Sequence, residues 1–268
     1  AVCENWNGTN WTEVGDLNTG RSAVLTSAGT DTAALAAGGY AGSPSGVANT
    51  ETWNGSAWTE VNDLNQSRYA LASGSNAPYT SCLAYAGNQG GGVLNESWNG
   101  TSWTELGDLN QARSYPGGSG SSNTSAVCFA GGNPPGYGSQ TETWNGTSWT
   151  EIADCSTSKN RVAGCGTGTS ALSTGGYTSP GANAATTEEL TVDAPVGAWT
   201  TSGSMNTARH PAGSAGTQTA GLVFGGGAGG TATKNAETET YNGTSFTEVA
   251  DLNSARSLGA GLGTQTAA

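Results

Sequence analysis

The chain has 268 residues, of which 44 are Gly and only 10% are charged, and its net charge is -12. This balance argues against a basic footprint for nucleic acid and against an anionic membrane surface as a partner. Nine Trp at regular places argue against disorder, and no apolar run approaches membrane-spanning length. We therefore expect a single all-β domain over residues 1–268, without nucleic-acid binding or membrane insertion.

The first residues of the chain have two features. Residues 1–20 lack the basic and apolar pattern of a signal peptide, so we expect any export signal to have been removed or never present. Residues 4–13 read ENWNGTNWTE, and this ten-residue segment recurs as ETWNGSAWTE at 51–60, ESWNGTSWTE at 96–105, ETWNGTSWTE at 142–151 and ETYNGTSFTE at 239–248. A repeat of this kind is typical of a stacked structural unit.

Each copy of the segment is predicted to be a β-hairpin. Asn-Gly favours a two-residue type I′ turn with positive φ at both positions, in which Trp98 would pair with Thr101, and Trp103 with Glu96. Both Trp side chains would then lie on one face, which the next copy would bury by stacking. The turn alone explains the N-G-[ST] sequons in these copies, and their glycosylation is left open.

The residues between the hairpins also repeat. Asp-Leu-Asn or a variant of it, one Arg, a small-residue run and an apolar run ending in Gly-Gly follow the hairpins. Two units depart from this pattern: the second has Gly87-Asn88 instead of a doublet, and residues 189–201 have a longer hairpin without Asn-Gly. The steps between the Glu-x-Trp anchors are 47, 45, 46, 47 and 50 residues, the anchors being Glu4, Glu51, Glu96, Glu142, Glu189 and Glu239. All six Arg are assigned to one repeat position and are expected to be structural, held by carboxylates or carbonyls: Arg21, Arg68, Arg113, Arg161, Arg209 and Arg256.

Each unit reads as four short strands. In the second unit we expect them at Arg68–Ser73, Ser81–Ala86, Leu94–Trp98 and Ser102–Leu106. First strands as small as PAGSAG suit convergence on an axis, where large side chains do not fit. Four-stranded units of about 46 residues, small inside and aromatic outside, indicate a β-propeller.

These residues resemble the Kelch repeat, in which an Arg precedes a Gly-Gly doublet, an aromatic third-strand residue and a fourth-strand Trp. The matching positions in one unit are Arg113, Gly131-Gly132, Trp144 and Trp149. The resemblance covers the whole chain. The segment WNGTSWTE is also similar to Kelch-like repeats in proteins encoded by marine bacteriophages. It implies six blades, at about 21–61, 68–106, 113–152, 161–201, 209–249, and 256–268 plus 2–14.

In that arrangement the N- and C-terminal strands share one blade and close the ring. TQTAA at 264–268 matches TQTAG at 217–221, but the LVFGG that follows the latter has no counterpart. Either this sixth blade is truncated or the natural chain is longer.

Residues that could carry chemistry are few. The five Cys lack zinc-type spacing; Cys82 and Cys128 are expected to be buried, and a disulfide between Cys155 and Cys165 is left open. Some Kelch-like propellers are copper oxidases, but this chain has one His, His210, which we expect to be structural or at the surface. Paired Glu residues recur in every unit, whereas one active site needs one pair. We expect no enzyme activity, cofactor or metal.

The loops after the Gly-Gly doublets vary while the frame repeats, and binding residues concentrate on such loops. Our hypothesis is a recognition module at a virion or cell surface, binding a glycan or protein receptor through Tyr40, Tyr137, Tyr177 and Asn133. The alternative is a structural or decoration protein of a viral or extracellular assembly, in which these loops contact neighbouring subunits.

Overall fold

The computed structural model describes residues 2–23, 26–42, 46–74, 76–88, 92–132, 136–193, 196–210, 212–227, 233–257 and 259–268. Within these ranges the protein is all-β, with 24 strands in seven antiparallel sheets of two to four strands. None of the described segments is a helix long and apolar enough to cross a membrane.

The sheets follow the repeat along the chain. The first is β1 (Cys3–Trp6) with β2 (Trp11–Val14). The next two are β3 (Thr26–Thr30), β4 (Ala33–Ala37), β5 (Thr50–Trp53) and β6 (Trp58–Val61), and then β7 (Cys82–Tyr85), β8 (Asn95–Trp98) and β9 (Trp103–Glu105). They are followed by β10 (Gly117–Ser122), β11 (Ser125–Phe129), β12 (Thr141–Trp144) and β13 (Trp149–Ile152).

The second half of the chain continues the pattern. One sheet consists of β15 (Ala163–Gly166), β16 (Ser170–Thr174), β19 (Thr187–Asp193) and β20 (Val196–Ser202), and another of β21 (Gly213–Thr217), β22 (Ala220–Phe224), β23 (Thr238–Tyr241) and β24 (Phe246–Val249). A small sheet joins β14 (Lys159–Asn160), β17 (Tyr177–Thr178) and β18 (Ala182–Asn183).

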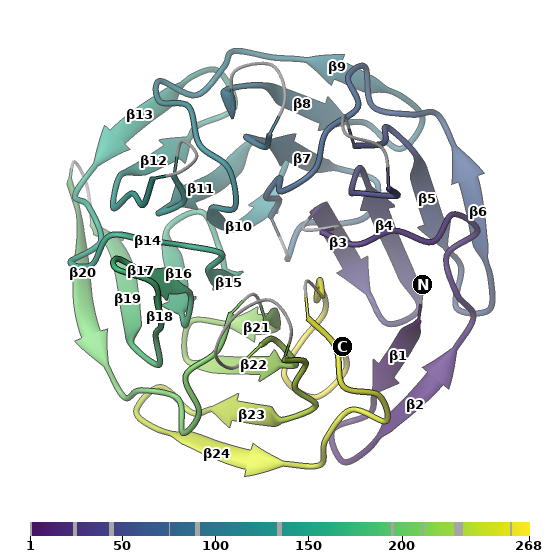
Figure 1. Ribbon diagram of the computed structural model, residues 1–268. Coiled ribbons are helices and arrows are strands. Elements are labelled where there is room, and N and C mark those ends of the chain that lie inside the picture. The colour runs from purple at the N-terminus through teal and green to yellow at the C-terminus, as the bar shows by residue number, and fades with distance from the viewer. Residues whose placement is uncertain are drawn as a thin grey trace.

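Figure 1 shows the larger sheets arranged around a common centre, in a propeller-like manner, with β3, β7, β10, β15 and β21 innermost. The inner strands approach one another closely because they are rich in glycine. A Cβ on Gly118 would lie 2.8 Å from the carbonyl oxygen of Ser73, and one on Gly164 would lie 2.8 Å from that of Gly118. The expected small inner strands are therefore confirmed, and their backbones pack directly against each other.

The hairpin turn differs from the prediction. Trp98 pairs with Trp103, and Glu96 with Glu105, so the connection is the four-residue segment 99–102 rather than Asn-Gly alone. The Asn99 side chain accepts hydrogen bonds from the backbone N–H groups of Thr101 and Ser102, both at 2.9 Å, which replaces the tight turn. The two Trp rings still share a face, with centroids 5.3 Å apart.

The turn yields a stability prediction at Gly100, whose φ is +93°. We expect Gly100→Val to lower the free energy of unfolding by about 1 kcal/mol or more, because a branched side chain is strained at positive φ. Thr101→Ala in the same exposed turn is the control and should leave the melting temperature unchanged. Equal melting temperatures for the two variants would contradict this account of the turn.

The first strand predicted in the second unit, Arg68–Ser73, is wrong. In that segment only Ala72 forms a bridge, to Tyr85, and the sheet that contains β7 has three strands. Ala70 adopts a φ of +59°, outside the extended region, so a strand cannot run continuously from Arg68 to Ser73. The other three strands of this unit are confirmed within one or two residues.

The assignment of Arg161 and Glu189 to the repeat is also wrong. The buried basic residue of that unit is Lys159, whose Nζ lies 3.3 Å from the carboxylate of Glu188. Leu190 pairs with Trp199, as Trp53 of the Glu-x-Trp segment pairs with Trp58 in another sheet. Glu188, two residues before Leu190, therefore occupies the repeated Glu position. Successive residues on a strand point to opposite faces, and only Glu188 has its carboxylate on the side of the basic residue.

Candidate functional site

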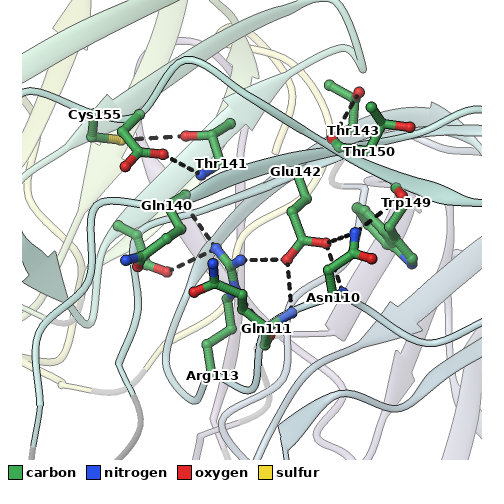
Figure 2. Close-up of polar contacts among 12 residues, drawn as sticks. Asn110, Gln111, Arg113, Gln140, Thr141, Glu142, Thr143, Trp149, Thr150 and Cys155 are labelled. Carbon is green, nitrogen blue, oxygen red and sulfur yellow. Dashed lines mark hydrogen bonds and ion pairs between the residues drawn. The ribbon is translucent and has the colours of Figure 1, made fainter.

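The carboxylates repeated in every unit are part of the frame. Figure 2 shows Glu142, 1% exposed, accepting hydrogen bonds from the Arg113 guanidinium and from the backbone N–H groups of Asn110 and Gln111. The side-chain amide of Asn110 donates both to Glu142 and to the carbonyl oxygen of Trp149. The expectation that the repeated Arg is held by a carboxylate and by carbonyls is confirmed for Arg113.

The same arrangement fastens one sheet to the next. In three connections the Asp holds its own sheet: Asp16 accepts from the N–H of Cys3, Asp63 from Thr50 and Asp154 from Thr141. The following Asn and Arg bind the next sheet's Glu, as Asn65 and Arg68 bind Glu96. Equivalent ion pairs join Arg21 to Glu51, Arg68 to Glu96, Lys159 to Glu188, Arg209 to Glu239 and Arg256 to Glu4. The structural role predicted for Arg holds for every member of the set except Arg161.

The structure places the predicted loop residues in two groups. Tyr40, 39% exposed, packs its ring 5.4 Å from that of Tyr69. The rings of Tyr137 and Tyr177 lie 6.3 Å apart. Asn133, together with Pro134 and Pro135, lies outside the described residues.

Four residues that sequence reasoning did not select join these groups. Tyr69 lies 6.5 Å from Tyr115, the guanidinium of Arg161 lies 5.1 Å from the Tyr115 ring centroid, and Tyr177 lies 4.3 Å from the His210 ring. We name the whole set the aromatic arc: Tyr40, Tyr69, Tyr115, Arg161, His210, Tyr177 and Tyr137.

Backbone hydrogen bonds hold the arc together. The connections that precede the first strands pair with the loops after the second strands, as in the bonds between Ser22 and Tyr40 and between His210 and Gly227. Neighbouring connections also join, since Tyr115 donates to the Ala70 carbonyl and Arg161 to the Tyr115 carbonyl. The two sets of loops therefore share one face of the protein.

His210 is the most enclosed member of the arc, being 2% exposed. Burial, and secondly the charge of Arg161, lower the pKa of its imidazole to about 4, so the ring is neutral at pH 7. Its Nδ1 is buried and has no hydrogen-bond partner among the described residues. The ring planes of His210 and Tyr177 are inclined by 32°, so the buried imidazole packs against the Tyr177 ring and supports it.

Arg161 is unusual among the basic residues of this acidic chain. Of the eight Lys and Arg, six form the buried ion pairs between sheets. In the part of the chain that the structure describes, only Arg161 and Lys234 are outside those pairs. Arg161 therefore supplies a single cation, held against an aromatic face, in a set that is otherwise uncharged.

The missed residues share a signal in the sequence. Tyr69 and His210 come directly after the repeat's basic residue, and Tyr115 and Arg161 come two residues after it. At these places other units have Ser22, Ala23, Ala70 and Ser114. Departures from the repeat immediately after its basic residue were therefore as informative as the variable loops.

The described residues offer little for covalent or metal chemistry. All five Cys are free, including Cys155 and Cys165, and burial raises the pKa of the Cys82 and Cys128 thiols to about 12. Within the described ranges, no group of three or more His, Cys, Asp or Glu side chains comes together. No protein-family model matches the chain, and a search of curated proteins finds no similar one.

Proposed function

We propose that the protein is a closed six-bladed β-propeller of Kelch-like repeats that acts as a non-enzymatic recognition module at a virion or cell surface. Six basic–acidic pairs, one for each unit, support six blades. The pair between Arg256 and Glu4, and the bonds between Trp6 and Ala268, support closure through the chain ends.

The observation that carries the functional proposal is the aromatic arc. A frame that repeats six times cannot by itself make a single site, whereas the arc occurs once and consists of residues that depart from the repeat. Its Tyr rings are partly exposed and held by their neighbours, so little conformational entropy is lost when a ligand binds them. Tyr presents an apolar face with a polar edge, which suits a glycan or a polar protein receptor.

A glycan array with purified protein tests this proposal. We expect the double variant Tyr137→Ala/Tyr177→Ala to lose tenfold or more of the affinity for any glycan that the unmodified chain binds, because both exposed ring faces are removed. Tyr79→Ala is the matched control, since Tyr79 is also half-buried but packs against the core instead of the arc.

The alternative predicts a different result. Should no glycan or cell-surface protein bind the unmodified chain, or should binding survive the double variant, the arc is not a receptor site. A structural or decoration role would then be favoured if the arc is covered by a neighbouring subunit in the native assembly.

A further inference from the structure

The guanidinium of Arg161 differs from those of the buried Arg residues between the sheets. Arg68, which is fully buried, donates to three backbone carbonyl oxygens and to the Glu96 carboxylate. The Arg161 guanidinium lies 5.1 Å from the centroid of the Tyr115 ring and makes no hydrogen bond or ion pair with another described residue. Arg161 is also half-buried rather than buried, so its N–H donors are available to a ligand.

The backbone fixes the place of this side chain. Arg161 comes two residues after the basic residue of its unit and has a φ of +55°, and Ala23, Ala70 and Tyr115 have the same place and φ values of +53°, +59° and +52°. The Arg161 N–H donates to the Tyr115 carbonyl at 2.8 Å, so the two side chains start from adjoining backbone. The other units have uncharged residues at this place, and the guanidinium is therefore a feature of one unit alone.

The loops of this face lack carboxylates, although the net charge of the chain is -12. The five loops after the second strands contain no Asp or Glu, at 38–49, 86–95, 130–140, 175–187 and 225–236. Burial raises the pKa of Tyr115, and burial together with the charge of Arg161 lowers the pKa of His210. No described carboxylate contributes to either shift, so an anion beside Arg161 meets no close like charge.

Arg161 lies between the two groups of rings. On one side its guanidinium contacts Tyr115. On the other, the preceding residue Asn160 pairs with Tyr177, because β14 and β17 lie side by side (Figure 1). A sugar stacked on Tyr177 therefore has Arg161 next to it. A guanidinium matches a carboxylate with two parallel N–H donors, and contact with Tyr115 restricts its rotamers before a ligand binds.

The number of available cations limits the charge of the ligand. In the part of the chain that the structure describes, Arg161 and Lys234 are the only basic residues outside the buried pairs between sheets. A polyanion is bound through many basic side chains, and the net charge of this chain opposes it. One cation among uncharged rings suits a sugar with an isolated carboxylate.

We propose that the aromatic arc binds an acidic glycan and that Arg161 selects it by pairing with a sugar carboxylate, while Tyr177 or Tyr137 stacks on a sugar ring. This inference rests on the proposed function and names the class of its ligand. Neutral glycans would contact the rings alone and bind more weakly. Arg161 is then the specificity-determining residue of the site, and the rings provide the affinity that acidic and neutral sugars share.

The test is a glycan array that carries glycans ending in uronic or sialic acid, each beside its methyl ester, which keeps the sugar and removes the charge. We expect the intact chain to bind the acid at least about tenfold more tightly than the ester. Arg161→Ala should lower affinity for the acid by about the same factor and leave affinity for the ester unchanged. The variant should fold, because Ala23 and Ala70 have this place and conformation naturally.

Lys234→Ala is the matched control, because it removes the same charge from an exposed residue outside the arc, and it should leave both affinities unchanged. The inference is overturned if ester and acid bind equally, if Arg161→Ala weakens both forms alike, or if heavily sulfated glycans are preferred. An effect of Lys234→Ala as large as that of Arg161→Ala would also overturn it, in favour of a general field. If neutral glycans bind and Tyr137→Ala/Tyr177→Ala abolishes that binding, only the acidic ligand is wrong; binding of no glycan rejects the glycan site itself.

Discussion

Replacing Arg113 with Ala should lower the free energy of unfolding by about 3–5 kcal/mol, because the change leaves a buried carboxylate without its counter-ion. The guanidinium is 3% exposed; it donates to the Gln140 carbonyl at 2.7 Å and to Glu142 at 2.5 Å. These bonds join the connection after β9 to the sheet of β12, so the loss falls on the contact between two sheets. Urea denaturation followed by Trp fluorescence measures it.

Two variants separate this effect from a general loss of positive charge. Arg113→Lys should cost less than Arg113→Ala, because Lys159 occupies the same repeat position and reaches its Glu. Arg161→Ala should change stability by less than 1 kcal/mol, since Arg161 contacts the Tyr115 ring and not a buried carboxylate. A loss for Arg161→Ala as large as that for Arg113→Ala would show that the ion pair is not the cause.

Trp103→Ala should also lower the free energy of unfolding by about 3–5 kcal/mol, through loss of a large buried ring and the cavity left behind. Trp103 is 6% exposed and packs against Trp98. Its indole N–H donates to the Thr50 hydroxyl in the preceding sheet, at 3.0 Å. Trp199 makes the same contact with Thr141, and Trp11 with Thr238, so the bond is a repeated link between sheets.

The matched variant is Trp103→Phe, because Phe246 occupies this position naturally. It keeps an aromatic ring but loses the hydrogen bond. We therefore expect the free energy of unfolding to fall by about 1 kcal/mol for the lost bond, with a smaller loss from reduced packing. Guanidinium denaturation of the two variants gives the comparison. If Trp103→Phe were as unstable as Trp103→Ala, the link to Thr50 rather than ring burial would dominate.

Much of the repeated architecture could be predicted from the sequence because the same sequence pattern recurs in each unit. The period of about 46 residues marked the sheets, and the small runs marked the inner strands. One Arg in each unit predicted a structural Arg, as seen in the buried pair between Arg113 and Glu142 of the next unit. The shared face of Trp98 and Trp103 was also predictable, since a two-residue and a four-residue connection both place them on the same side.

The register within the frame needed the tertiary structure. Asn-Gly signals a two-residue turn, yet the Asn99 side chain satisfies two backbone N–H groups and so stabilises a longer connection. Lys159 and Arg161 are two residues apart and chemically alike, and only burial beside Glu188 distinguishes the structural cation from the one on the loop face.

The candidate sites depended on tertiary structure most of all. Tyr40, Tyr115 and Tyr177 are separated by more than sixty residues. Ring contacts join Tyr40 to Tyr115 through Tyr69, and the backbone pairing of Asn160 with Tyr177 places Tyr177 beside the same connections. Local sequence determines which residues can form a strand or a loop, but only the packed sheets decide which of these residues lie side by side.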